Sequence, residues 1–329
     1  MSFSTLPSPV LLTGAAGFIA SRTAHFLLDA GVEVIGVDNL NDYYDVRLKR
    51  HRLSGLENRP GFSFYELDIE NLPALRLLFE LRRPAAVLNL AARAGVGYSL
   101  KNPHVYLTTN ANGTLNLLEC MRAFQVQKMV LASTSSLYAG LPMPFSETLP
   151  VNTPISPYAA SKKAAEVMAY TYHFLFGMDV SVVRYFTVFG PAGRPDMSIY
   201  RFIQWILHGK KLQLTGDGSQ SRDFTFVDDI ARGTIAALRP VGFEILNLGG
   251  GRNPRSMRDV IAHIEQRLGK TADIQHLPMP PEDMPATWAD IEKAGRLLDW
   301  RPEISLEEGL DRTIAWHLEH QEFLAGLRM

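Results

Sequence analysis

The feature that most constrains the fold is a short apolar run that ends in a glycine-rich turn and continues as an amphipathic helix. The run is PVLLT at 9–13, and TGAAGFIA from Thr13 to Ala20 follows it. Gly14 permits a tight turn, Gly17 lets backbone amides approach a pyrophosphate, and the small Ala20 allows close helix-to-strand packing. The helix N-terminus then faces the negative charge. The segment predicts the first unit of a nucleotide-binding parallel sheet, although a plain strand-to-helix turn has the same pattern.

The alternation of strands and helices continues along the first half of the chain. Further runs rich in β-branched and aromatic residues predict strands at 33–37, 62–66, 86–90, 128–132 and 180–185. Between them, apolar residues three and four positions apart predict helices, the longest at 103–124 and 156–175. This order predicts an α/β fold, a doubly wound parallel sheet covered on both faces.

Prolines and glycines become frequent after residue 190 and break the alternation. We therefore expect a nucleotide-binding domain at 1–185 and a smaller α/β substrate domain at 186–329. The segment at about 224–249 reads as one more helix and strand, which would return to the first domain.

Length and composition exclude several classes of protein. A chain of 329 residues is longer than single cores usually grow, so two domains or one enlarged domain are expected. A net charge of −1 without runs of like charge argues against a nucleic-acid partner, and no apolar stretch is long enough for a membrane span. Cys120 is the one cysteine, and the N-terminus lacks a signal-peptide pattern, so we expect a cytoplasmic location.

Acidic residues after the second and third predicted strands indicate which dinucleotide would bind. Asp38 lies 21 residues after Gly17, where a carboxylate accepts hydrogen bonds from an adenosine ribose and repels a 2′-phosphate, so NAD is favoured over NADP. Asp68 is placed to reach the adenine, although an acid there could equally cap a helix. Small residues at 90–92 leave room along the pyrophosphate.

A tyrosine and a lysine begin the long helix predicted at 156–175. Tyr158 and Lys162 are four residues apart, so both side chains project from one helix face. Nearby positive charge favours the phenolate, and we expect a lowered pKa that makes Tyr158 a usable base. The hydroxyl-rich run from Ser133 to Tyr138 offers groups that could hold a sugar, or it is a solvated loop.

Five segments occur in the order typical of one family. TGAAGFIA, the run around Thr134, YAASK, DFTFVDD and NLGG resemble the extended short-chain dehydrogenase/reductases that act on nucleotide sugars. The resemblance implies a Rossmann-type sheet of about seven strands, NAD as cofactor, no metal, and a catalytic set of Thr134, Tyr158 and Lys162. The cofactor-binding residues that it implies are Gly14, Gly17, Phe18, Ile19, Asp38, Asn39, Asp68, Ile69, Leu90, Ala91, Ala92, Tyr158, Lys162 and Tyr185.

Three longer motifs are similar to those of the UDP-glucuronate 4-epimerases within that family. They are DNLNDYYD with LK shortly after it, AARAGVGYS, and RYFTVFGPAGRPDM. The resemblance implies a UDP-sugar partner and a homodimer formed through the helices near 103–124 and 156–175. The substrate-binding residues that it implies are Arg93, Ser135, Ser136, Thr187, Arg194, Arg222 and Asp283. Thr187 and Arg194 are expected to hold a sugar carboxylate, because arginine offers a planar fork for that group.

Other activities on the same scaffold stay open. Family dehydratases carry an Asp-Glu pair where Ser135 and Ser136 stand, and decarboxylases typically carry glutamate at the second position, so both are disfavoured. Gly97 departs from the arginine usual in the glucuronate epimerases. The alternatives are a UDP-glucose or UDP-N-acetylhexosamine 4-epimerase, a UDP-glucuronate decarboxylase, and a non-catalytic NAD-binding regulator.

Overall fold

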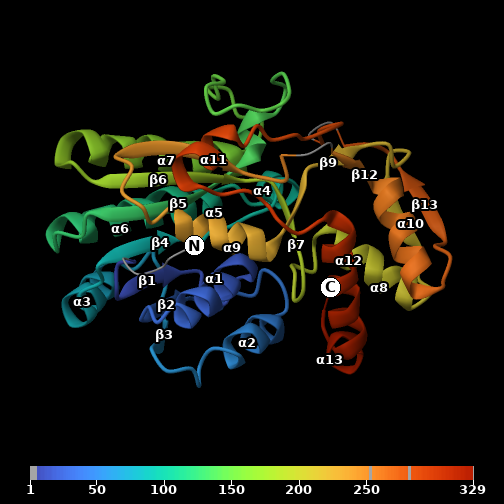
Figure 1. The fold of residues 1–329 in the computed structure, drawn as a ribbon, viewed down its shortest axis with the longest axis horizontal. Helices are drawn as coiled ribbons and strands as arrows, with labels where there is room; N and C mark the ends of the chain where they lie inside the picture. Colours follow the sequence, from blue (N-terminus) through green and yellow to red (C-terminus); the bar gives the residue numbers. More distant parts are fainter. Residues whose placement is uncertain (1–5, 252–253, 281–282, 329) are drawn as a thin grey trace.

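A computed structural model describes residues 6–251, 254–280 and 283–328, and its centre is a seven-stranded parallel sheet (Figure 1). The strand order is β11-β6-β5-β4-β1-β2-β3. Successive strands are added on one side of β1 up to β3 and on its other side from β4 onward, so the strand order reverses between β1 and β4. The strands are β1 (Val10–Thr13), β2 (Val34–Asp38), β3 (Phe62–Glu66), β4 (Ala86–Asn89), β5 (Lys128–Thr134), β6 (Asp179–Tyr185) and β11 (Phe243–Leu248). The doubly wound Rossmann-type sheet and its seven strands are confirmed.

Helices bury both faces of the sheet. Leu11 of β1 packs into one apolar cluster with α3, α6 and α7, while its neighbours Val10 and Leu12 pack into a second cluster with α1, α9 and α11. This period-2 alternation within a fully buried strand is what a parallel sheet covered on both sides requires. The helices of the two layers are α1 (Phe18–Asp29), α3 (Leu72–Arg82), α6 (Gly113–Ala123), α7 (Pro157–Phe176), α9 (Val227–Ala236) and α11 (Glu292–Leu298).

The helix predicted at 103–124 contains a π-helical segment. Its parts are α5 (His104–Tyr106), the π-helix η1 (Leu107–Asn112) and α6. The Asn110 side chain in η1 accepts from the backbone of Arg93 and donates back to it, both at 2.9 Å, and donates to Ser161 Oγ of α7 at 2.9 Å. Side-chain spacing does not predict such long-range bonds, and π-turns of this kind are frequent at functional sites.

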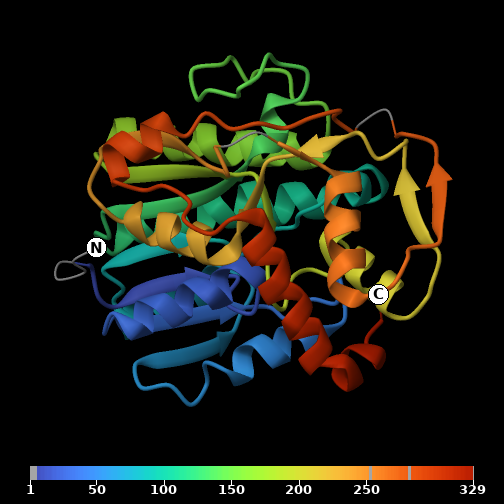
Figure 2. The ribbon, with the colours of Figure 1, turned by 45° about the vertical axis from the view of Figure 1, so that its right-hand side comes forward.

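The remaining elements gather beside the sheet, at the right of Figure 1 and towards the viewer in Figure 2. Helices α8, α10 and α12 share an apolar cluster, flanked by short two-stranded sheets. These elements are α8 (Ser198–Leu207), α10 (Met257–Leu268), α12 (Leu306–Glu319), α13 (Gln321–Ala325), β7 (Thr187–Phe189), β8 (Leu212–Thr215), β9 (Ser221–Arg222), β10 (Phe224–Phe226), β12 (Arg255–Ser256) and β13 (Ile274–Leu277). Two more helices, α2 (Val46–Ser54) and α4 (Val96–Lys101), follow β2 and β4.

The segment at 224–249 contributes to the sheet. Its first three residues form β10 and pair with β7, where the sequence had predicted helix from residue 224. Helix α9 then packs on α1, and β11 pairs in parallel with β6 from Phe243 to Leu248. No helix in the described part of the chain is long and apolar enough to cross a bilayer.

A buried ion pair joins α7 to the two strands beneath it. Arg184 of β6 donates from Nε and Nη2 to the two carboxylate oxygens of Glu166, at 2.9 and 2.8 Å. Glu166 also accepts from Ser133 Oγ of β5 at 2.6 Å, and Arg184 Nη1 donates to the Tyr138 hydroxyl at 2.8 Å. Both charged side chains are buried. Charges removed from water need such complete pairing.

We expect Glu166→Gln to lower the free energy of unfolding by about 3–5 kcal/mol, because Arg184 would remain buried without its anion. Urea denaturation followed by circular dichroism measures this change. The matched control is Arg301→Ala, which removes an exposed ion pair with Glu292 and should cost less than about 1 kcal/mol. Equal decreases in the free energy of unfolding for the two substitutions would show that the buried pair matters no more to stability than the exposed one.

Candidate active site

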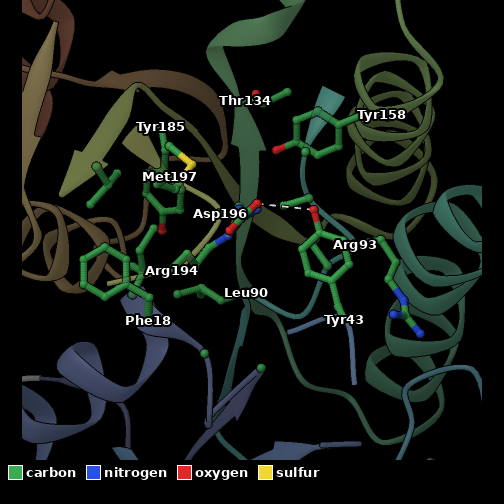
Figure 3. Close-up of a pocket in the computed structure, with 18 of the residues that line it drawn as sticks. Phe18, Tyr43, Leu90, Arg93, Thr134, Tyr158, Tyr185, Arg194, Asp196 and Met197 are labelled. Carbon is green, nitrogen blue, oxygen red and sulfur yellow. Dashed lines mark hydrogen bonds and ion pairs between the residues drawn. The ribbon is translucent and has the colours of Figure 1, made fainter. Parts of the chain in front are cut away.

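A cavity of about 950 Å³ opens at the carboxyl ends of the sheet strands. Every site residue named from the sequence, from Gly14 to Asp283, lines it. Figure 3 shows how side chains from distant segments, including Phe18, Leu90, Tyr158 and Arg194, converge there. Ligands of doubly wound sheets bind at this edge, where the strand order reverses.

The glycine-rich turn requires both of its predicted glycines. Gly14 has φ +72°, and a Cβ there would lie 2.8 Å from the backbone nitrogen of Ala91, after β4. A Cβ on Gly17 would lie 2.8 Å from the carbonyl oxygen of Gly14. The turn is therefore packed tightly at the start of α1, as a cradle for a pyrophosphate needs.

The carboxylate of Asp38 is anchored at the end of β2. It accepts from the backbone nitrogens of Ala16 at 3.2 Å and Leu40 at 2.8 Å, and Lys49 Nζ lies 3.5 Å from it. These contacts hold the carboxylate at the cavity wall. The sequence analysis assigned no role to Lys49, although its motif had been noted.

Asp68 lines the cavity and does not cap the helix that follows it. One oxygen accepts from Asn39 Nδ2 at 2.6 Å beside the cavity, and the other accepts from the backbone nitrogen of Glu70 at 2.9 Å, which stabilises the turn before α3. Asn71, not Asp68, caps that helix, because its side chain accepts from Ala74.

Tyr158 and Lys162 occupy the first turns of α7, next to the end of β5. The helix begins after Ser156, whose hydroxyl accepts from the backbone nitrogen of Ala159 at 3.2 Å, with Pro157 at its first position. Lys162 Nζ donates to the carbonyl oxygen of Ala132 at 2.9 Å. The lysine is buried and held against the strand that ends in Thr134.

The pKa values at this position are set mainly by burial. Burial raises the pKa of Tyr158, while hydrogen bonding with Thr134 and the charge of Arg194 oppose the increase. The expectation that the pKa of Tyr158 is lowered is therefore wrong for the chain's own groups. Burial also lowers the pKa of Lys162 to about 8, against the charge of Glu166. The protein alone keeps the phenol protonated, and the ionised phenolate needs further positive charge.

Arg194 is close enough to affect the ionisation of Tyr158, but its direct partner is a residue that the sequence analysis did not select. It donates from Nε and Nη2 to the carboxylate of Asp196, at 3.0 and 2.5 Å. The Tyr43 hydroxyl donates to the same carboxylate at 3.3 Å, as the dashed line in Figure 3 shows. Although burial disfavours its charge, Asp196 raises the pKa of Arg194. Thr187 lines the same cavity.

Another ion pair lines the cavity on the side formed by the late segments. Arg222 Nη2 donates to Asp283 Oδ1 at 2.5 Å, so two of the residues predicted to bind the substrate are paired with each other. Burial lowers the pKa of Arg222, and Asp283 opposes this. Arg93 Nε is buried and has no hydrogen-bond partner in the described part of the chain. The cavity therefore offers cationic groups to an anionic ligand.

The cavity contains further polar and aromatic residues that the sequence reasoning did not select. They include Tyr43, Lys49, Tyr98, Lys101, Asp196 and Arg201. Tyr43, Lys49, Tyr98 and Asp196 fall inside the motifs on which the family resemblance rests, so membership of those motifs was the available signal. Ser135 and Ser136 also line the cavity, directly after Thr134.

Comparison with known proteins agrees with this geometry. Residues 10–249 match the model of the NAD dependent epimerase/dehydratase family. The chain belongs to this family. NAD is its cofactor, and the glycine cradle and the anchored Asp38 fit that group.

Individual relatives are similar over nearly the whole chain. A UDP-glucuronate 4-epimerase of Thermodesulfobacterium geofontis is 57% identical, over 97% of this chain and 99% of that protein. The crystal structure of UDP-glucuronic acid 4-epimerase from Bacillus cereus with UDP-glucuronic acid and NAD has a TM-score of 0.89 at 37% identity, and covers 94% of this chain and 99% of that one. UDP-glucose 4-epimerase of Thermotoga maritima with UDP-glucose has a TM-score of 0.87 at 31% identity, covering 95% and 99%.

We expect Asp38→Asn to narrow the preference for NAD over NADP by roughly 10- to 100-fold, because the carboxylate repels a 2′-phosphate and like charges in contact cost several kcal/mol. Lys49→Met should widen the preference, since Lys49 partly neutralises Asp38. Calorimetric titration of both variants with each cofactor measures the two ratios. Equal affinities of the unmodified protein for NAD and NADP would rule out this role of Asp38.

Proposed function

We propose that this protein interconverts UDP-glucuronate and UDP-galacturonate by NAD-dependent epimerisation at carbon 4. The observation that carries the proposal is the convergence of Tyr158, Lys162 and Thr134 with Arg194 in one cavity, where a base for a sugar hydroxyl adjoins a cation for a sugar carboxylate. The relatives described above support the same substrate.

The two parts of the chain take different ligands in this proposal. Residues 1–185, together with about 224–249, form the NAD-binding domain, and the rest of 186–329 forms the UDP-sugar-binding domain. The pairing of β11 with β6 and the packing of α9 on α1 support assigning 224–249 to the first domain. Arg222 and Asp283, from the second part, line the shared cavity and serve the UDP moiety.

Each catalytic residue has a distinct task. Tyr158 accepts the proton of the sugar 4-hydroxyl, and Thr134 donates a hydrogen bond that favours the phenolate. Lys162, held by the Ala132 carbonyl, places a positive charge near the phenolate. Bound NAD supplies a hydride acceptor that later returns the hydride, together with the positive charge of its nicotinamide. The sugar becomes a 4-keto intermediate, turns over about its link to the diphosphate, and regains a proton from Tyr158 on reduction.

The intermediate is a β-keto acid, so the site must also suppress loss of carbon dioxide. Loss requires the breaking bond to stand perpendicular to the ketone plane. Thr187 and Arg194 hold the carboxylate out of that alignment, as a charge-assisted clamp. Serines at 135 and 136, in place of the family's acidic residues, and Arg93 complete the set of groups around the sugar and diphosphate.

Incubation with UDP-glucuronate, followed by NMR of the products, tests the function. The unmodified protein should form UDP-galacturonate without net reduction of cofactor. Tyr158→Phe should slow turnover roughly 100- to 10,000-fold while UDP-glucuronate still binds, because the substitution removes only the proton acceptor. No UDP-galacturonate from the unmodified protein would refute the proposal, and undiminished turnover of the variant would place the base elsewhere.

The protein acts as a homodimer through the helices near 103–124 and 156–175. Helix α7 carries Val167, Tyr170 and Phe174, which lie three and four residues apart and are each more than half exposed. Leu107 of η1 is exposed as well, and an isolated protein rarely exposes such a stripe without a partner.

Light scattering after gel filtration should report a dimer at micromolar concentration. Val167→Glu combined with Phe174→Glu should give a folded monomer, because two carboxylates would be buried without partners. Leu77→Glu on α3, at an equally exposed apolar position, should leave the mass unchanged. A monomer in the unmodified protein would refute this assembly.

The location that we propose is the cytoplasm. The cysteine content supports this, since Cys120 is the one cysteine of the sequence and is free and buried, so the fold uses no internal disulfide of the kind that oxidising compartments favour.

A further inference from the structure

Asp196, the ion-pair partner of Arg194, lines the cavity but has no role in the proposed chemistry. We propose that Asp196, held by Tyr43, fixes the orientation of the Arg194 guanidinium and so determines the selectivity of the site for a sugar that carries a carboxylate. This inference rests on the proposed function and adds a positioning pair to it. Asp196 and Tyr43 act through Arg194 rather than on the reacting atoms.

The ion pair uses one edge of the guanidinium. Nε and Nη2 of Arg194 donate to the two oxygens of Asp196, which is the parallel two-bond arrangement that fixes a guanidinium plane most firmly. Pro195 stands between the two residues and limits the backbone freedom of the turn. Nη1 makes no hydrogen bond within the described part of the chain, so the edge of the guanidinium that carries Nη1 is left for another carboxylate.

Tyr43 fixes the carboxylate from a different segment. It lies in the loop between β2 and α2, and its hydroxyl donates to Asp196 Oδ2 at 3.3 Å. Arg194 Cζ lies 5.8 Å from the centre of the Tyr43 ring, and the ring packs edge-on against Tyr98 at 5.2 Å. Burial and Asp196 raise the pKa of Tyr43 to about 12, so the hydroxyl remains a donor at neutral pH.

The chain also leaves space for this contact. Gly95 has φ +109°, and a Cβ there would lie 2.7 Å from the Tyr43 hydroxyl and 3.8 Å from Arg194 Nη2. Tyr43 and Asp196, from two separate segments, thus meet beside the Arg194 guanidinium (Figure 3), and Gly95 leaves the room that they need. An arginine paired with Asp196 and packed beside the Tyr43 ring presents its free edge in a defined direction.

The orientation matters because a cation that attracts a carboxylate does not by itself fix its plane. A loosely held guanidinium would still attract the anion, but the sugar ring could then change its pucker until the bond between carbon 5 and the carboxylate stands perpendicular to the plane of the 4-keto group. That bond then breaks, its electron pair passes to the ketone, and a proton from solvent completes a 4-keto pentose as carbon dioxide leaves. Selectivity for the acidic sugar and retention of its carboxylate therefore share one cause.

The test uses the full-length, NAD-loaded protein with UDP-glucuronate and UDP-glucose as probes. Asp196→Asn should raise the Kd for UDP-glucuronate roughly 10- to 100-fold, the range of a lost charge-assisted contact, and should release 4-keto pentose. The Kd for UDP-glucose should stay within about twofold, because that sugar has no carboxylate. Tyr43→Phe should act in the same direction but by roughly 2- to 10-fold, since it removes a neutral donor.

Two comparisons complete the experiment. Arg194→Ala gives the largest change to be expected in the Kd for UDP-glucuronate and in the release of 4-keto pentose. Asp42→Asn is the matched control, because it removes an exposed carboxylate that is next to Tyr43 in the sequence but does not line the cavity. Asp42→Asn should behave as the unmodified protein in Kd and in products.

Several results would overturn the inference. Unchanged Kd values and no pentose with Asp196→Asn would show that Arg194 needs no positioning by Asp196. An equal rise in Kd for both sugars would indicate general damage to the site instead. In both cases the unmodified protein still forms UDP-galacturonate, so the proposed function stands. If the unmodified protein forms none, the proposed function fails and the inference fails with it.

Discussion

The site depends on the buried pair between Glu166 and Arg184. Glu166 of α7 is bonded to Arg184 of β6 and to Ser133 of β5, so the helix is tied to both strands. The residues that follow these two in the sequence, Tyr185 and Thr134, line the cavity. Lys162 lies one helical turn before Glu166 and feels its charge. A buried ion pair contributes little net stability compared with apolar packing, but it permits few alternative arrangements. Its value here is that a helix and two strands hold Tyr158, Lys162 and Thr134, the proposed catalytic groups, in one relative position.

Three of the cationic side chains that line the cavity share one feature: each forms an ion pair with a carboxylate of the chain. Lys49 lies beside Asp38, Arg194 beside Asp196, and Arg222 beside Asp283. A buried cation without an anion is costly, so the chain supplies one in advance of any ligand. A phosphate or carboxylate of a ligand then binds beside an existing ion pair and accepts hydrogen bonds from donors that are still free. Arg93 Nε is such a free donor in the described part of the chain. The affinity for an anionic ligand in such a site depends on which N–H donors of each cation are not already bonded to its carboxylate partner.

Much of the molecule follows from local sequence patterns. The bounds of the six strands predicted in the first 185 residues lie within two residues of the observed ones. Most buried parallel strands are continuous apolar runs, and glycines or charged residues mark where the runs begin and end. The membership of the cavity was also predictable, since the carboxyl ends of parallel strands meet at one edge. The π-helical turn at Asn110, the partner of Arg194 and the direction of the Tyr158 pKa were not. Each depends on contacts between segments far apart in the chain, such as Tyr43 with Asp196, or on burial, which a motif does not report.

The position of β11 at the sheet edge has a consequence for biosynthesis. The strand is translated only after all of α8, β10 and α9, yet it covers the edge of β6. Until the ribosome has read the intervening codons, the edge of β6 presents unpaired backbone groups, and Val183 lacks the side chains of α9 and β11 that share its apolar cluster in the finished protein. The seven-stranded sheet therefore cannot be completed before β11 has been synthesised, and until then the nascent polypeptide carries an unpaired edge strand, which is the kind of surface that promotes aggregation.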